Sequence, residues 1–155
     1  MLQEMWDGPP QTGFYLSPVP ERVDDDVEVL RAEARGENLP PGRVPQRTWW
    51  AVDEMNRFAG IIRLRHPLTE TLLRDGGNIG YIVRPSMRGQ GIATEMLALV
   101  LDEARQSGLK NVLLTTDTTN EESRNVIERN GGVLDPVKVD PAQDWLRYWI
   151  PLKPE

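Results

Sequence analysis

Residues 83–93 read Val83-Arg84-Pro85-Ser86-Met87-Arg88-Gly89-Gln90-Gly91-Ile92-Ala93, and they join two apolar patterns of different period. Before them, residues 78–84 carry the near-continuous apolar pattern of a buried central strand, which Pro85 ends. After them, residues 91–107 place their apolar side chains on one helical face, and Gly108 closes the helix. The stretch is therefore predicted to be a glycine-rich turn from a strand into the N-terminus of a helix.

A turn of this kind favours an anion. The first N–H groups of a helix have no acceptor within the helix, and the helix dipole is positive at that end. Gly89 and Gly91 keep side chains away from this point, while Arg88 adds a charged donor. The stretch lacks the spacing of a P-loop and that of a dinucleotide fingerprint, so it favours a diphosphate other than that of an NTP or NAD.

Outside this stretch, the patterns predict a single α/β domain over residues 1–155. Residues 1–43 are predicted to form an acidic extended lead-in followed by a helix over 21–35. Residues 66–77 read as a loop, and Asn120 is predicted to cap a helix that ends at Gly131-Gly132. The predicted strands are residues 49–52, 58–64, 78–84 and 112–116, with a closing hairpin over 133–139 and 145–152.

Composition excludes several classes of protein. The chain of 155 residues has no cysteine, so disulfides, thiolate metal sites and a cysteine nucleophile are excluded. No apolar run reaches the roughly 20 residues of a membrane span, and no targeting segment is evident, so a cytoplasmic protein is expected. The net charge is -6, and no basic stripe interleaved with aromatic residues indicates a nucleic acid partner.

The hexapeptide from Arg88 to Ala93 reads Arg-x-x-Gly-x-Ala and resembles the signature of the GCN5-related N-acetyltransferase (GNAT) family. A second block, Asn120-x-x-Ser123 followed by Gly131-Gly132, is similar to the family's later motif. Residues 44–152 further resemble an uncharacterised bacterial subgroup of these enzymes. Its pattern includes Val44-Pro45, Trp49-Trp50, Leu64-Arg65-His66, Gly76-Gly77-Asn78-Ile79-Gly80-Tyr81 and Arg147-Tyr148-Trp149.

The resemblance implies a GNAT-type fold, with a mixed, mostly antiparallel sheet flanked by helices and a splayed central cleft. It implies acetyl-CoA as co-substrate and no metal. The backbone of Ile82 and Val83 would then meet the pantetheine and the thioester. Asn120 and Ser123 would contact the pantetheine arm or another phosphate region of CoA, although Asn120 has the alternative of a plain helix cap. The pyrophosphate would be held by Arg88, Gly89, Gln90, Gly91, Ile92 and Ala93.

The family's chemistry is direct attack of a neutral amine on the thioester. No general base is evident in the sequence, and the family's usual acid, a tyrosine, falls at Ile127. The candidates for catalysis are Tyr81 and Tyr148, which are phenols near the expected cleft, and His66, the single imidazole. Each has a structural alternative, as a half-buried strand aromatic or an ordinary surface histidine.

The expected function is therefore N-acetyl transfer from acetyl-CoA to a primary amine in a ternary complex. The acidic N-terminal helix would attract a cationic amine, or it is simply a solvated face. The tryptophans would pack in the core or line the acceptor pocket, and the C-terminal hairpin would suit a homodimer seam. The alternative function is a non-catalytic acyl-CoA-binding sensor, which the absent base and Ile127 favour.

Overall fold

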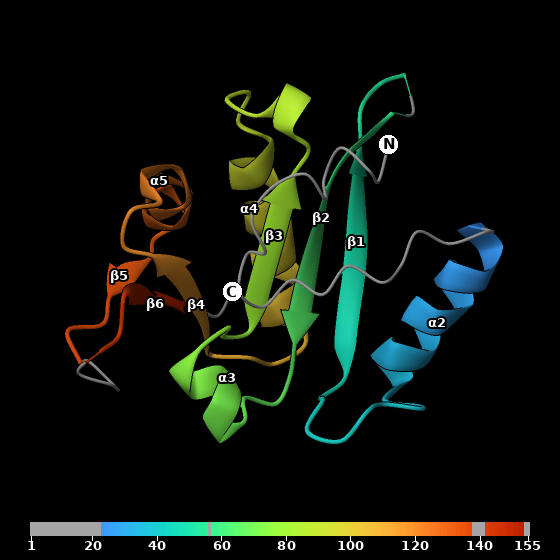
Figure 1. The fold of residues 1–155 in the computed structure, drawn as a ribbon, viewed down its shortest axis with the longest axis horizontal. Helices are drawn as coiled ribbons and strands as arrows, with labels where there is room; N and C mark the ends of the chain where they lie inside the picture. Colours follow the sequence, from blue (N-terminus) through green and yellow to red (C-terminus); the bar gives the residue numbers. More distant parts are fainter. Residues whose placement is uncertain (1–22, 56, 138–141, 154–155) are drawn as a thin grey trace.

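The computed structural model describes residues 23–55, 57–137 and 142–153, and the predicted lead-in over 1–20 lies outside them (Figure 1). The elements are, in chain order, α2 (Val23–Arg35), β1 (Gln46–Val52), β2 (Phe58–Arg65), α3 (Glu70–Arg74), β3 (Ile79–Val83), the 3-10 turn η1 (Pro85–Met87), α4 (Ile92–Gln106), β4 (Asn111–Asp117), α5 (Glu121–Arg129), β5 (Val133–Leu134) and β6 (Trp145–Pro151).

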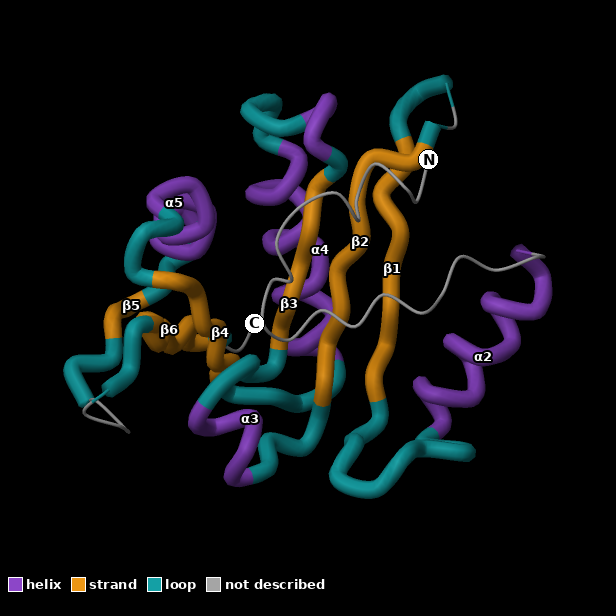
Figure 2. Tube along the Cα trace, in the orientation of Figure 1, coloured by secondary structure: helices purple, strands orange, loops and turns teal. Residues whose placement is uncertain are grey.

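The described strands form two antiparallel sheets, one ordered β1-β2-β3 and the other β4-β6-β5. β3 and β4 are thus edge strands that face each other, and no ladder joins them along the described residues. α4 lies behind the first sheet, and α5 lies beside the outer end of β4 (Figure 2). The two sheets therefore diverge between β3 and β4, which agrees with the splayed central cleft that the family resemblance implied.

A shared core holds the two sheets together. The buried face of α4 presents Met96, Leu97, Val100 and Ala104. These side chains pack in one cluster with strand residues of both sheets, namely Ile62, Leu64, Ile79, Val83, Val112, Leu114, Tyr148 and Ile150. Burial of apolar surface at about 25 cal/mol per Å² makes this cluster the main source of stability. α4 is therefore a rigid base for whatever binds at its N-terminus.

Asn78 closes the inner end of the gap between the sheets. Its side chain is 1% exposed, accepts from Leu113 N–H of β4 at 2.9 Å and donates to the carbonyl of Arg65 of β2 at 3.0 Å. The preceding residue, Gly77, has φ +60, and a Cβ there would lie 2.2 Å from the Leu113 carbonyl oxygen. A close backbone approach and a bridging amide thus hold β3 and β4 together at this end, and the strands diverge from here.

Substitution of Asn78 by alanine is expected to lower the free energy of unfolding by about 2–4 kcal/mol. The reason is that the Leu113 N–H and the Arg65 carbonyl would each lose a hydrogen-bond partner where the Asn78 side chain is now buried. Urea unfolding followed by circular dichroism measures this. Asn111→Ala, at the exposed start of β4, is the control and should change stability by less than about 0.5 kcal/mol. Equal effects of the two substitutions would contradict the role given to Asn78.

Most predicted elements are confirmed, including the helix over 91–107 and the cap at Asn120, whose side chain accepts from the Ser123 N–H. Two predictions were wrong. Residues 66–77 contain α3, which Thr69 caps by accepting from the Leu72 N–H. The strand expected over 133–139 is only β5, because Pro136 cannot donate to a ladder; residues 138–139 lie outside the described part. The division into a lead-in and a core stays a prediction.

Candidate functional site

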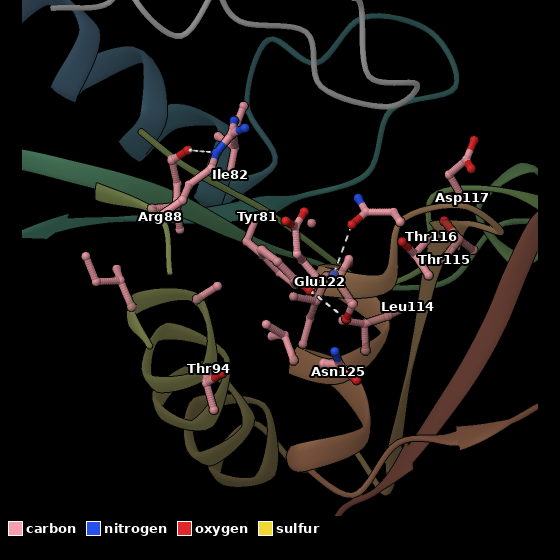
Figure 3. A pocket seen from close by; sticks show the side chains of 18 of the residues that line it. Tyr81, Ile82, Arg88, Thr94, Leu114, Thr115, Thr116, Asp117, Glu122 and Asn125 are labelled. Carbon is pink, nitrogen blue, oxygen red and sulfur yellow. Dashed lines mark hydrogen bonds between the residues drawn. The ribbon is translucent and has the colours of Figure 1, made fainter. Parts of the chain in front are cut away.

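A cleft of about 850 Å³ lies between β3 and β4. One wall is β3 with the loop after it, and the other is β4 with the start of α5 (Figure 3). Because β3 pairs only with β2, the N–H and C=O groups on its other edge point into this cleft. The walls therefore offer both side chains and free backbone groups to a bound molecule.

The N-terminus of α4 opens onto the cleft without a side-chain cap. Gly91 is the N-cap residue with φ 80, and Gly89 has φ 73, which are left-handed values that favour glycine. A Cβ at either position would meet nothing within 4 Å, so the space in front of both glycines is open. The first N–H groups of α4 therefore face the cleft with no acceptor inside the helix, as an anion site requires.

Arg88 lies beside this helix end. Its Nε donates to the Val83 carbonyl at 3.0 Å, which fixes the side chain against the last residue of β3 (Figure 3). Arg88 also lines the cleft. A charge-assisted donor is thus held next to the free N–H groups.

Tyr81 reaches from β3 across the cleft to α5. Its hydroxyl lies 2.8 Å from Ser123 Oγ and 3.3 Å from the Ser123 carbonyl oxygen. Burial raises the pKa of Tyr81 to about 12, although the hydrogen bond with Ser123 lowers it. The phenol therefore keeps its proton at neutral pH and can act as a proton donor.

The cleft is also lined by residues on the face of β3 and β4 opposite the Tyr81 side chain. Because Tyr81 points toward α5, its neighbours Gly80 and Ile82 face the other way. Thr115 of β4 lies on that side, where its hydroxyl accepts from the Gly76 N–H at 3.0 Å and donates to Asp75 Oδ1 at 3.4 Å. Arg65 lies on this side too, since its guanidinium donates to the Gly76 carbonyl at 3.0 Å. Asp117 and its strand partner Trp145 share the face of Thr115 by register, and Asp144 precedes Trp145 in the cleft lining.

The structure gathers most of the predicted binding residues around this cleft. Tyr81 lines it, together with Ile82, Val83, Arg88, Gly89, Gly91, Ile92, Ala93, Asn120 and Ser123. Gln90 belongs to the same loop but is exposed and is not among the lining residues. His66 is exposed after β2, and Tyr148 is buried with its hydroxyl donating to Glu128; neither lines the cleft.

Sequence reasoning missed several lining residues. Val126 and Arg129 follow Ser123 at steps of three on α5, so helical spacing from the predicted contact residue could have found them. Asp75 follows the last residue of α3 and Trp145 begins β6, so the two are far apart in the sequence. The Trp145 indole N–H donates to the Arg74 carbonyl at 2.9 Å, and no local pattern signals such a contact.

A comparison with family models finds the acetyltransferase (GNAT) domain over residues 4–133. The chain belongs to the GNAT acetyltransferase family. As a member, it is an acetyl-CoA-dependent acyltransferase. The match begins well before residue 44 and includes α2, for which the sequence resemblance had given no assignment. No curated protein matches the chain significantly.

Solved structures of other GNAT acetyltransferases share the fold. A chimera of the spermidine N-acetyltransferase SpeG from Vibrio cholerae and hSSAT is 18% identical, with a TM-score of 0.64, covering 97% of this chain and 88% of that one. The spermidine N-acetyltransferase from Vibrio cholerae in complex with CoA and spermine is 18% identical, with a TM-score of 0.59, covering 86% and 78%. An acetyltransferase from Agrobacterium tumefaciens is 17% identical, with a TM-score of 0.58, covering 92% and 98%. These likenesses confirm the GNAT fold.

The residues of this acetyltransferase fit the CoA group that the family uses. The uncapped N-terminus of α4 and the open space before Gly89 and Gly91 suit a diphosphate. The free edge of β3 suits the amide groups of a pantetheine arm, because both present N–H and C=O groups along their length. Along the described residues, no group of three or more potential metal-binding side chains is found, and no helix is long and apolar enough to cross a bilayer.

Proposed function

We propose that this acetyltransferase transfers the acetyl group of acetyl-CoA to a primary amine by direct attack in a ternary complex. The observation that carries the proposal is the uncapped N-terminus of α4, which opens onto the cleft between β3 and β4. Bound acetyl-CoA supplies a thioester, which is an acetyl group activated for attack by an amine. The chain's own contribution is to hold that thioester, admit the amine and manage protons.

In this proposal, the N–H groups at the start of α4 and the Arg88 guanidinium hold the pyrophosphate. The free edge of β3 at Tyr81 and Val83 holds the pantetheine arm, because the Ile82 backbone, which the sequence resemblance implied for this role, pairs with Ile61 of β2. A free N–H of this edge donates to the carbonyl oxygen of the acyl group. Ser123 and Asn120 form the opposite side of the same channel. Ser123 belongs to α5, and Asn120 caps that helix, since its side chain accepts from the Ser123 N–H at 3.0 Å.

Tyr81 is the residue that we assign as proton donor to the departing sulfur. The geometry and the raised pKa both support it, because the phenol lies in the cleft and stays protonated at neutral pH. Ile127, where the family often has a tyrosine, is fully buried and has no proton to give. We assign no side chain as base, so the amine loses its proton to solvent and the rate should rise with pH toward the amine pKa, about 10.4 for an alkylamine.

The acceptor is proposed to be cationic and to enter from the face opposite Tyr81. Three carboxylates line the cleft near Arg65, those of Asp75, Asp117 and Asp144. Burial lowers the pKa of Arg65 to about 10, which still leaves it charged at neutral pH. The three carboxylates that line the cleft favour an alkylammonium, and polyamines are the acceptors named for the Vibrio cholerae enzyme.

The Asp75→Asn substitution is expected to raise KM for a cationic amine about tenfold, since it removes a half-buried charge but keeps the shape. KM for acetyl-CoA should stay within about twofold. Initial rates at saturating acetyl-CoA measure the first quantity, and Asp102→Asn on the exposed face of α4 is the matched control. An unchanged KM for the amine would remove Asp75 from the acceptor site.

Initial-rate kinetics test the proposal as a whole. Acetyl-CoA and a panel of amines, including spermidine and a lysyl peptide, are varied together while CoA thiol release is followed and the acetylated amine is identified by mass spectrometry. Direct transfer predicts intersecting lines in double-reciprocal plots, and a trapped acyl-enzyme with parallel lines would contradict it. Binding of acetyl-CoA with no amine raising turnover above hydrolysis would instead favour the sensor. The cytoplasmic location and the homodimer stay predictions from the sequence.

A further inference from the structure

The cleft does not end at the N-terminus of α4 but continues between the first turn of α4 and the outer part of α5. Thr94 lines this extension from α4, and Asn125, Val126 and Arg129 line it from α5. The two helices are held together here. The Asn130 side-chain amide donates to the Thr94 carbonyl at 3.2 Å and to the Val126 carbonyl at 3.0 Å. The extension is therefore a fixed part of the cleft wall.

Arg129 places a positively charged side chain at this extension. It is exposed in the last turn of α5, and it makes no hydrogen bond or ion pair with any other residue that the structure describes. The neighbouring Glu128 is engaged by the Tyr148 hydroxyl at 2.9 Å. Glu122, the acidic residue of α5 that lines the cleft, is seven residues away, which is about 10 Å along a helix. An anion that reached the extension would thus meet an available guanidinium.

The chemistry of CoA supplies such an anion at this place. The diphosphate of CoA is attached to a ribose that carries a further phosphate on its 3′ oxygen, and this monoester is close to doubly charged at neutral pH. With the diphosphate at the N-terminus of α4, the ribose would have room in the extension beside the first turn of that helix. Arg129 is adjacent to Asn130, whose side chain contacts that same turn at Thr94. Arg129, which lines the extension, would therefore lie beside the ribose.

We propose that Arg129 binds the 3′-phosphate of CoA and makes this acetyltransferase discriminate CoA from dephospho-CoA, which lacks that group. The inference rests on the proposed function, because it assumes the diphosphate at the N-terminus of α4. It goes further in giving the cleft a second anion subsite. A guanidinium can form two parallel hydrogen bonds to a phosphate, which supports recognition rather than simple attraction.

Calorimetric titration of the full chain with CoA and with dephospho-CoA tests the proposal. Wild type should bind CoA about tenfold more tightly than dephospho-CoA, as one partly exposed charged hydrogen-bonding pair predicts. Arg129→Gln should weaken CoA binding about tenfold and leave dephospho-CoA binding within twofold. Arg129→Lys should keep most of the preference, because it keeps the charge. Arg31→Gln, an exposed position on α2, lowers the net charge equally and should change neither affinity.

Three outcomes would overturn the inference. Equal binding of CoA and dephospho-CoA by wild type would show that the 3′-phosphate is not recognised. A preference that survives in Arg129→Gln would place the recognition elsewhere, and equal weakening of both ligands would mean that the substitution disturbs α5 as a whole. In each case CoA would still bind, so the proposed function would stand. Binding of neither ligand by folded wild type would overturn both proposals together.

Discussion

Arg88→Glu is expected to lower the affinity for acetyl-CoA by about 100-fold or more. The substitution removes a charge-assisted donor, a contribution of about 1.5–3 kcal/mol, and places a negative charge beside the N–H groups that would hold the pyrophosphate. Calorimetric titration with acetyl-CoA measures the change. Because Arg88 Nε also donates to the Val83 carbonyl, thermal unfolding must be recorded beside it.

Two variants separate charge from packing in that experiment. Arg88→Gln keeps a donor but loses the charge, and it should reduce affinity about tenfold, well short of the glutamate variant. Arg84→Glu makes the same charge change at the other end of η1, outside the residues that line the cleft, and should have a much smaller effect. Unchanged acetyl-CoA affinity in a folded Arg88→Glu protein would place the pyrophosphate away from the α4 N-terminus.

Tyr81→Phe should lower kcat by about 100-fold, within the range of about 10²–10⁴ that a positioned general acid contributes. KM for acetyl-CoA should change little, because the ring stays in the cleft and only the hydroxyl is lost. The pH dependence of kcat is a second test of this role of Tyr81. Since the pKa of Tyr81 is about 12, the donor stays protonated across the accessible range, and wild-type kcat should rise with pH without falling again below about pH 11.

The other two catalytic candidates serve as comparisons. Tyr148→Phe removes a phenol that donates to Glu128 outside the cleft, and His66→Gln changes an exposed side chain beyond β2. Neither substitution should lower kcat more than about twofold. A large loss in either variant, with Tyr81→Phe near wild type, would reverse our assignment of the proton donor.

The loop and its two flanking elements could be predicted because their signals are local. The backbone at position 91 has a positive φ, which favours glycine, and the apolar residues of α4 repeat at helical spacing. Asn120 caps the helix that directly follows it. These features need no knowledge of the rest of the chain. For the same reason the loop at the α4 N-terminus was the part of the cleft that the sequence could locate.

The part of the cleft that we propose as the acceptor side could not be predicted, because segments distant in the sequence assemble it. Asp75 and Trp145 meet there only after α3 docks on the second sheet, and the five residues of α3 are too few for a periodic signal. The alternation of side chains along a strand also does not show which face of the strand lines a cleft. Tyr81 and Tyr148 read alike in the sequence, and only the packing turns one toward Ser123 and the other toward Glu128.

The central claim is that the α4 N-terminus holds acetyl-CoA in the cleft between the two sheets. A calorimetric titration of the wild-type protein with acetyl-CoA, and with ATP in parallel, tests it most directly. We predict saturable one-to-one binding of acetyl-CoA in the micromolar range, with ATP neither binding comparably nor competing. A folded protein that binds no acetyl-CoA, or one from which ATP displaces it, would contradict the account.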